Sequence, residues 1–293
     1  MEFLAFKVFL RKKIIFICFI SALLLQSDFG FAQQNNQKNK FVDNKVHEHI
    51  FELKTRREIF LIALGAGLNA YNAYLQSNVV PLTPLEISQL DPLQVNPFDR
   101  KTIDNFREEG AGDYLLYASF LIPLTVPLTI FKGEEHRSDW KVWAVMTSEL
   151  ILINSGFNGI LKASVLRTRP FVYNTDVSID LKTEKNARYS FYSGHTSVTA
   201  SFSFFTARLF ASYLNNTRTK TLIWIGAVTY PMLTGFLRLD TGRHFRTDVI
   251  TGYFFGAFFG YIMPDLHRIT NDRLSVRPSF GGGGLNVYLS YAL

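Results

Sequence analysis

Three short polar clusters carry side chains that could do chemistry, and each borders an apolar stretch of this 293-residue sequence. Lys162, Arg169 and Arg238 are cations suited to hold an oxyanion. Arginine in particular offers a planar fork of N–H donors that matches the oxygens of a phosphate group. The clusters therefore point to the binding of a phosphate or a similar anion. They span residues 162–170, 192–195 and 238–248.

The same clusters supply groups that could move protons or attack an electrophile. Ser193 adds a hydroxyl, and Gly194 lets a backbone N–H approach closely at the expected start of a helix, where anions bind readily. His195 and His244 are the two imidazoles, and Asp248 follows His244 by four residues, so the last two share one helix face. An aspartate so placed can hold one imidazole nitrogen protonated and free the other for nucleophilic attack.

Apolar blocks must position these clusters, and each block approaches the roughly 20 residues needed to cross a bilayer. Two blocks, joined by the short loop 215–220, separate His195 from Arg238, so the chain returns to the face it left. All three clusters are therefore expected at one membrane face. The six blocks are Ile59–Leu75, Tyr114–Phe131, Val142–Leu161, Thr196–Leu214, Thr221–Leu237 and Val249–Met263.

The blocks predict an all-α fold, a polytopic membrane helix bundle of five or six spans with its active site at one membrane face. Hydrophobic residues make up 47% of the chain and charged residues 19%, which excludes a disordered chain. The net charge of +7 lies beside the apolar blocks, where it favours a topology signal or anionic lipid over a nucleic-acid partner. The single cysteine, Cys18, excludes an internal disulfide. A soluble all-α core is the alternative.

The two ends of the chain differ from the bundle. Residues 1–32 combine basic residues, an apolar core and small residues at their end, which predicts a secretory signal peptide; an uncleaved membrane helix is the alternative. Residues 33–113 are expected to form an N-terminal segment with a candidate first membrane helix, and residues 114–264 the membrane domain. Residues 265–293 form a tail that ends in a strand-like alternation, as a single strand or as part of a hairpin. A cleaved signal peptide conflicts with a spanning helix over residues 59–75.

Several other residues carry expectations of their own. Glu149 and Arg208 lie within apolar blocks, where charges are costly and usually paired, so they are a candidate ion pair. Three glycines share one helix face and would let another helix approach: Gly252, Gly256 and Gly260. Three cations near the clusters are expected to contact headgroups at the interface: Arg167, Arg243 and Arg246. Four histidines outside the clusters are expected to face solvent: His47, His49, His136 and His267.

The order and spacing of the clusters resemble the signature of the type 2 phosphatidic acid phosphatase superfamily, which includes bacterial acid phosphatases and vanadium haloperoxidases. The matching pattern is Lys-x6-Arg-Pro, Ser-Gly-His and Arg-x5-His-x3-Asp, over residues 162–248. Two positions depart from the family: Tyr192 stands where it usually has proline, and Leu237 where it often has serine. Neither position supplies a group that the chemistry requires, so the departures bear on substrate identity.

The resemblance implies a role for each matched residue. His244 attacks phosphorus and forms a phosphohistidine, Asp248 orients His244, and His195 protonates the leaving oxygen and then activates water. Positioned cations stabilise the charge of a phosphoryl transition state, so no metal and no cofactor is expected. The phosphoryl oxygens are bound by Lys162, Arg169, Arg238, Ser193 and the Gly194 amide.

The resulting hypothesis is a membrane phosphatase that hydrolyses a lipid phosphate or diphosphate monoester. Its expected partners are the bilayer and the substrate lipid. Lysine and arginine in loops 132–141 and 215–220 indicate that these loops are cytoplasmic, so the site faces the periplasm or outside of a bacterial inner membrane. The alternatives are a lipid phosphotransferase with the same intermediate, a haloperoxidase and a non-catalytic anionic-lipid binding protein. The particular lipid and the oligomeric state stay open.

Overall fold

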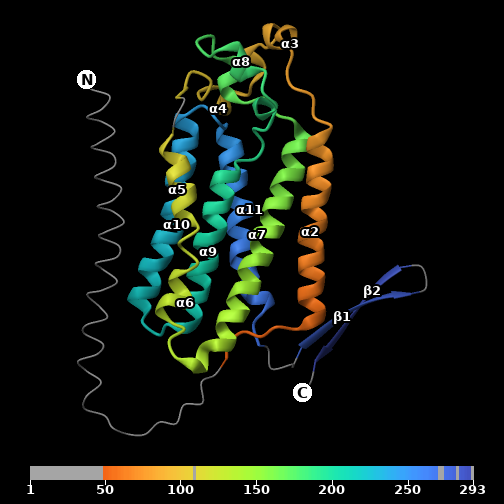
Figure 1. The fold of residues 1–293 in the computed structure, drawn as a ribbon, viewed down its shortest axis with the longest axis vertical. Coiled ribbons are helices and arrows are strands. Elements are labelled where there is room, and N and C mark those ends of the chain that lie inside the picture. Colours follow the sequence, from red (N-terminus) through yellow and green to blue (C-terminus); the bar gives the residue numbers. More distant parts are fainter. Residues whose placement is uncertain (1–48, 108–109, 270–273, 282–283, 292–293) are drawn as a thin grey trace. The chain divides into compact units, whose positions relative to one another are not determined.

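The computed structural model describes residues 49–107, 110–269, 274–281 and 284–291, so the predicted signal peptide over residues 1–32 lies outside the described residues. Most of the described chain is helical (Figure 1). The long helices are α2 (Thr55–Ser77), α7 (Arg137–Val165), α9 (Gly194–Tyr213), α10 (Thr217–Asp240) and α11 (Arg246–Leu266). The short ones are α3 (Pro84–Ser88), α4 (Pro97–Arg100), α5 (Ala111–Ser119), α6 (Thr125–Thr129) and α8 (Ile179–Lys182).

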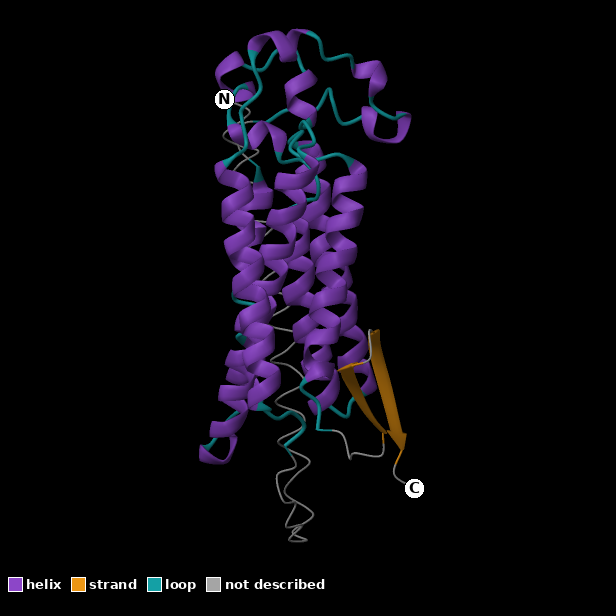
Figure 2. Ribbon diagram, turned by 90° about the vertical axis from the view of Figure 1, so that its right-hand side faces the viewer, coloured by secondary structure: helices purple, strands orange, loops and turns teal. Residues whose placement is uncertain are grey.

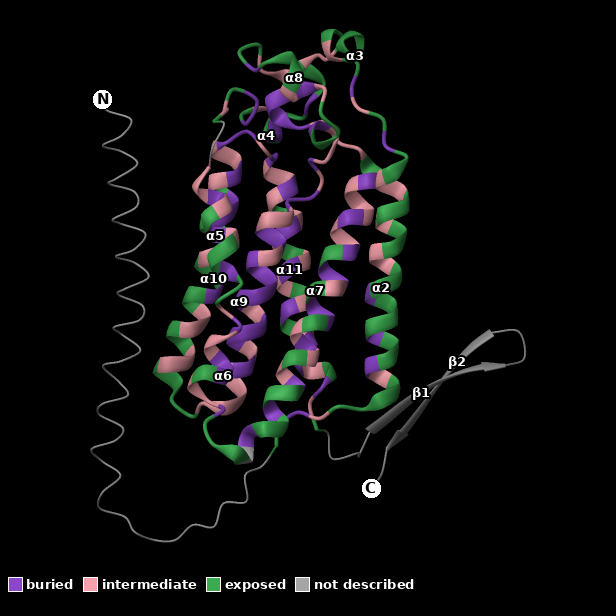
Figure 3. Ribbon diagram, viewed as in Figure 1, coloured by how far each residue is buried: buried purple, intermediate pink, exposed green. Residues whose placement is uncertain are grey.

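Three segments of the described chain are long and apolar enough to cross a membrane: Arg137–Tyr173, Thr217–Asp240 and Arg246–Leu266. Large apolar side chains are also exposed on the outer sides of the helices, among them Phe60 and Phe236 (Figure 3). Helices that are apolar on their outer as well as their inner faces are typical of membrane spans. The prediction of a helical membrane bundle is thereby confirmed.

The block Tyr114–Phe131 does not form one spanning helix, as the sequence predicted. Helix α5 ends at Ser119, turns cover residues 120–124, and α6 adds one short stretch of helix. Pro123 explains the break, because proline has no N–H to donate and restricts the residue before it. The other five blocks each lie within one continuous helix.

Helix α9 lies at the centre of the bundle, where it packs against α10 and α11, while α2 packs along α7. The core between these helices is aliphatic and aromatic, with Leu150, Phe205 and Leu209 fully buried. Because α9 has neighbours on several sides, its position determines where the ends of the other helices meet.

Glycines allow α11 to approach the backbone of α9 closely. A Cβ atom on Gly252 would lie 2.5 Å from the carbonyl oxygen of Ser193. Gly256 and Gly260 face the carbonyl oxygens of Ser197 and Ser201 in the same way. The structure therefore confirms the close approach expected from this glycine spacing.

The predicted ion pair between Glu149 and Arg208 is wrong. Arg208 instead donates to Asp265 of α11 at 2.5 Å. The Nε2 atom of His267 lies 3.0 Å from Glu149 Oε2, and His267 is fully buried rather than facing solvent. His136 is also buried, with Nδ1 2.7 Å from Asp139 Oδ2. The sequence alone does not specify which helix faces are buried against one another, and so it does not specify which charges meet.

The segments 78–107 and 166–193 form a cap of short helices and turns near the C-terminal end of α7 (Figures 1 and 2). Phe171 and Val172 form a small separate core there with Leu82. Helix α4 contacts α11, so the cap reaches the residues around the third polar cluster. Its 3₁₀ turns are Pro92–Gln94, Pro170–Tyr173 and Lys185–Arg188, and a further one, Glu134–His136, precedes α7.

The C-terminal tail forms a two-stranded antiparallel hairpin of β1 (Leu274–Gly281) and β2 (Gly284–Tyr291). Leu274 pairs with Tyr291, and Gly281 pairs with Gly284. The strand expected from the alternating tail is present, in the hairpin form that the sequence had left open.

Substituting Gly256 with alanine should destabilise the bundle, because the new Cβ would collide with the Ser197 carbonyl oxygen. We expect a loss of about 1–3 kcal/mol in the free energy of unfolding, measured in mixed micelles of increasing SDS fraction. Gly226→Ala in α10 is the matched control, since nothing lies within 4 Å of its added Cβ. Equal losses in the two variants would contradict the packing described for α9 and α11.

Candidate active site

The structure brings the three polar clusters together at one end of the bundle. Lys162 lies in the last turn of α7, Gly194 begins α9, Arg238 lies in the last turn of α10, and His244 immediately precedes α11. Alternating chain direction therefore places the end of two helices and the start of two others at one level (Figure 1).

His244 is fully buried and held in one tautomer. Its Nδ1 atom lies 2.7 Å from the backbone carbonyl oxygen of Ser190. A carbonyl oxygen can only accept, so Nδ1 carries the proton and Nε2 presents a lone pair. Nε2 has no hydrogen-bond partner within the described chain. A buried nitrogen without a partner costs free energy, and this one is available for nucleophilic attack.

The surroundings of His244 keep its imidazole neutral. Burial lowers the pKa of His244 well below its ordinary value, and the charges of Arg169, Lys162 and Arg238 lower it further. A site with this many cations attracts an anion. The same cations that would hold a phosphate therefore also preserve the His244 lone pair.

Asp248 does not hold His244 directly. Its Oδ2 atom lies 3.9 Å from His244 Nδ1 and accepts instead from the Ser190 hydroxyl at 2.5 Å and from the Phe245 amide at 2.8 Å. Ser190 thus stands between the two residues, with its hydroxyl on Asp248 and its carbonyl on His244. The backbone of Asp248 also accepts from the Ser193 amide at 3.0 Å, which joins the second and third clusters.

Arg167 bridges two buried carboxylates and does not extend to the interface as the sequence predicted. It donates to Asp248 Oδ1 at 2.5 Å and to Asp99 Oδ2 at 2.8 Å, and its guanidinium lies 4.1 Å from the Phe245 ring centroid. Burial raises the pKa of Asp99, but hydrogen bonds from Arg167 and Thr247 outweigh it, and the net pKa is lowered. Asp99 escaped sequence reasoning because it lies in the short helix α4, far from the three clusters in sequence, and belongs to no motif.

The predicted phosphate-binding cations lie close enough to His244 for their charges to act on it. Arg169 is buried and fixed by the Asn186 carbonyl oxygen at 2.9 Å and the Arg243 carbonyl oxygen at 3.1 Å. Arg238 is buried too, and its Nε atom has no partner within the described chain. Fixed guanidinium groups lose little freedom when an anion binds, which favours binding.

Ser193 and Gly194 shape the start of α9. The Ser193 hydroxyl caps the helix by accepting from the Thr196 amide, and it lies 2.9 Å from the Thr196 hydroxyl. A Cβ atom on Gly194 would lie 2.9 Å from Asn158 Oδ1 and 3.3 Å from Lys162 Nζ. Glycine is therefore needed because α7 side chains approach its backbone.

His195 contacts an acid that sequence reasoning missed. Its Nε2 atom lies 2.6 Å from Asp113 Oδ1, and the same oxygen accepts from Arg238 at 3.0 Å. Asp113 lies in the first turn of α5 and is about half exposed. No motif marks it; the only signal is an acid just before an apolar block.

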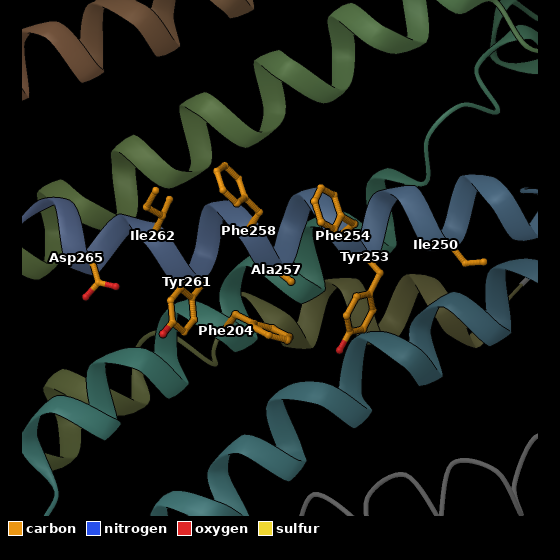
Figure 4. Close-up of a pocket in the computed structure, with 9 residues that line it drawn as sticks. All are labelled: Phe204, Ile250, Tyr253, Phe254, Ala257, Phe258, Tyr261, Ile262 and Asp265. Carbon is orange, nitrogen blue, oxygen red and sulfur yellow. The ribbon is translucent and has the colours of Figure 1, made fainter. Parts of the chain in front are cut away.

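An apolar groove of about 620 Å³ runs along the outer side of α11 and contains none of the residues of the three clusters (Figure 4). Phe204 of α9 borders it, and Asp265 lies at its end. The rest of its lining comes from α11: Ile250, Tyr253, Phe254, Ala257, Phe258, Tyr261 and Ile262. The only charged residue in its lining is the acid Asp265, so the groove is not suited to hold a phosphate.

Comparisons with known proteins point to the same family. Residues 142–271 match the family model of the PAP2 superfamily, in agreement with the predicted resemblance to type 2 phosphatidic acid phosphatases. Among solved structures, the chain is similar to the first transmembrane PAP2 type phosphatidylglycerolphosphate phosphatase from Bacillus subtilis. The identity is 22% and the TM-score 0.40, and the match covers 71% of this chain and 92% of that one. None of the curated proteins matches the chain.

Replacing Arg167 with methionine should strongly destabilise the protein, because Asp99 and Asp248 would be left buried without their cation. We expect a loss of about 3–5 kcal/mol in the free energy of unfolding. Arg218→Met, which removes an exposed cation in the first turn of α10, is the control and should change it by less than about 0.5 kcal/mol. Similar unfolding curves for both variants would show that the buried bridge contributes nothing.

Proposed function

We propose that this protein is a membrane phosphatase that hydrolyses a lipid phosphate or diphosphate monoester through a phosphohistidine intermediate. The observation that carries the proposal is the unpartnered Nε2 atom of the buried His244. It lies under the charges of Arg169, Lys162 and Arg238, which suit a phosphoryl group. The match to the PAP2 superfamily supports the same chemistry.

In the first step, the Nε2 lone pair of His244 attacks phosphorus. The bond between phosphorus and the leaving oxygen breaks, and that oxygen takes a proton from His195. The phosphorylated imidazole is then positively charged, and the Ser190 carbonyl, backed by Asp248, stabilises it through Nδ1–H. Asp248 is therefore a positioning residue that acts through Ser190.

In the second step, His195 takes a proton from a water molecule, and the water oxygen attacks phosphorus. The P–N bond breaks, its electron pair returns to His244, and inorganic phosphate leaves. Asp113 holds the protonated nitrogen of His195 and balances Arg238 before the substrate arrives. The phosphoryl oxygens then replace Asp113 as the partner of Arg238, with Lys162, Arg169 and the Gly194 amide as further donors and Ser193 fixing the helix start.

A lipid substrate follows from where the site lies. The clusters form at the ends of helices that are long and apolar enough to cross a membrane, so a headgroup can reach His244 while its tails stay in the bilayer. The cationic loop 215–220 lies at the opposite end of α9 and α10, so the positive-inside rule favours a site on the outer face of a bacterial inner membrane.

The decisive experiment compares phosphate release by detergent-purified wild type and His244→Ala. The substrates are phosphatidate, phosphatidylglycerol phosphate, undecaprenyl diphosphate and lipid A. We expect the variant to lose at least about a thousandfold in rate, because the nucleophile is gone. Acid-quenched wild type should carry a phosphoryl label from labelled substrate, and the variant should not. His49→Ala is the control, since His49 pairs with Asp139 away from the three clusters.

Other outcomes would replace the proposal. Label that moves to an acceptor lipid without free phosphate would identify a phosphotransferase. Lipid binding without turnover, unchanged in His244→Ala, would identify a non-catalytic lipid-binding protein.

The pH dependence should reflect the lowered pKa of His244. A histidine with a lowered pKa stays neutral, and so nucleophilic, as the pH falls through its ordinary value. We therefore expect kcat/KM to persist below about pH 6.5 and to fall only at more acidic pH. Repeating the profile with a substrate of different phosphate pKa separates substrate ionisation from that of His244. An acid limb at or above about pH 6.5 with both substrates would contradict the assignment.

A further inference from the structure

A second buried polar cluster lies at the other end of the bundle from His244. Glu58 comes from the first turn of α2, Glu149 from α7, and His267 from the C-terminal end of α11. One ligand atom from each lies within 4.8 Å of the others, and within the described chain this is the one such group of histidine, cysteine and acidic side chains. Helix α11, with 21 residues, separates the cluster from the candidate active site by about 30 Å.

Three polar atoms in this cluster lack hydrogen-bond partners within the described chain. Both carboxylate oxygens of Glu149 and the Nε2 atom of His267 are buried and make no hydrogen bond within the described chain. Both residues are 0% exposed. A buried carboxylate without a partner costs several kcal/mol, so a fold that keeps one in this position needs a compensating group.

The hydrogen bond on the other side of the His267 ring defines what that group must be. Nδ1 lies 3.0 Å from the backbone carbonyl oxygen of Met263, which can only accept, so Nδ1 carries the proton. Nε2 then presents its lone pair to Glu149 Oε2 at 3.0 Å and to Glu58 Oε1 at 3.6 Å. Three acceptors facing one another repel unless positive charge lies between them.

We propose that Glu58, Glu149 and His267 bind a divalent transition-metal ion of the zinc class. Zinc binds histidine nitrogen and carboxylate oxygen at about 2.0–2.2 Å in a tetrahedral arrangement, which separates neighbouring ligand atoms by about 3.3 Å. The distances of 3.0 and 3.6 Å from Nε2 bracket that separation. An ion among the three atoms would satisfy Nε2 and an oxygen of each glutamate at once.

A single shared proton satisfies this cluster less well. The short Nε2 to Oε2 contact is not aligned as a hydrogen bond, since both atoms lack a hydrogen-bond partner. A metal ion does not have to lie on the line between His267 Nε2 and Glu149 Oε2. It would lie beside that line and contact these two atoms and Glu58 Oε1.

The surroundings supply the outer contacts that metal ligands usually have. The Met263 carbonyl fixes the tautomer and orientation of His267. Arg57 donates to both oxygens of Glu58, at 2.6 and 3.2 Å, and the Lys54 amide donates at 2.9 Å. The ligands come from three helices far apart in sequence, so a bound ion would join α2 to α7 and α11 at this end.

The test is metal binding by the full chain, purified in detergent with any polyhistidine tag removed. After treatment with a chelator, the protein is loaded with Zn²⁺, passed through a desalting column and analysed for zinc. We expect one ion per chain and a Tm at least several degrees above that of the metal-free protein. Glu149→Gln, which keeps the shape of the side chain, should lower the affinity at least tenfold and abolish the Tm shift.

Two variants serve as controls. His49→Gln removes a histidine outside the cluster, and His244→Ala removes the proposed nucleophile, so both should bind zinc like the wild type. The inference is independent of the proposed function, because its readouts are bound metal and Tm. It is overturned if the wild type retains no zinc, or if Glu149→Gln binds it equally well. If the wild type binds no metal and Glu149→Gln is more stable than the wild type, the cluster holds a shared proton instead.

Discussion

The close contact between the backbones of α9 and α11 is the constraint on which the rest of the site depends. Gly252, Gly256 and Gly260 let α11 lie directly against the carbonyl oxygens of α9. At the end of that contact, the Ser193 amide donates to the Asp248 carbonyl. Side chains larger than a hydrogen atom would separate the helices, and the second and third polar clusters would lose their register.

A series of buried hydrogen bonds then connects the packing of α9 and α11 to His244, whose Nε2 atom is the proposed nucleophile. Asp99 holds Arg167, Arg167 holds Asp248, Asp248 holds Ser190, and the Ser190 carbonyl holds His244. Each member is buried or nearly so, and such networks are stable only when every group has a partner. The cap of short helices therefore does more than connect the spans. It supplies Asp99, the member of this hydrogen-bond series that is farthest from His244 along the series.

The buried charges are unbalanced in opposite directions at the two ends of the bundle. Around His244, three buried or partly buried cations exceed the nearby acids, and an anion such as a phosphate completes the balance. Around Glu149, two carboxylates exceed the single guanidinium of Arg57, and a cation completes it. In both places one of the unpartnered atoms is the Nε2 of a histidine whose Nδ1 is fixed by a backbone carbonyl, which leaves that Nε2 free for a ligand.

The sequence by itself determined five of the six helical blocks, the strand-like tail, the glycine face of α11 and the resemblance to the PAP2 superfamily, because all depend on local composition or on fixed spacing along the chain. It also placed the three clusters at one end, since counting crossings needs no side-chain detail. Only the tertiary structure decided which buried charges meet. Arg208 pairs with Asp265 and not with Glu149, and Arg167 bridges Asp99 and Asp248. Asp113 reached His195 from another helix. Such pairings depend on the rotation and depth of each helix, which are set by packing against neighbours and not by spacing within the chain.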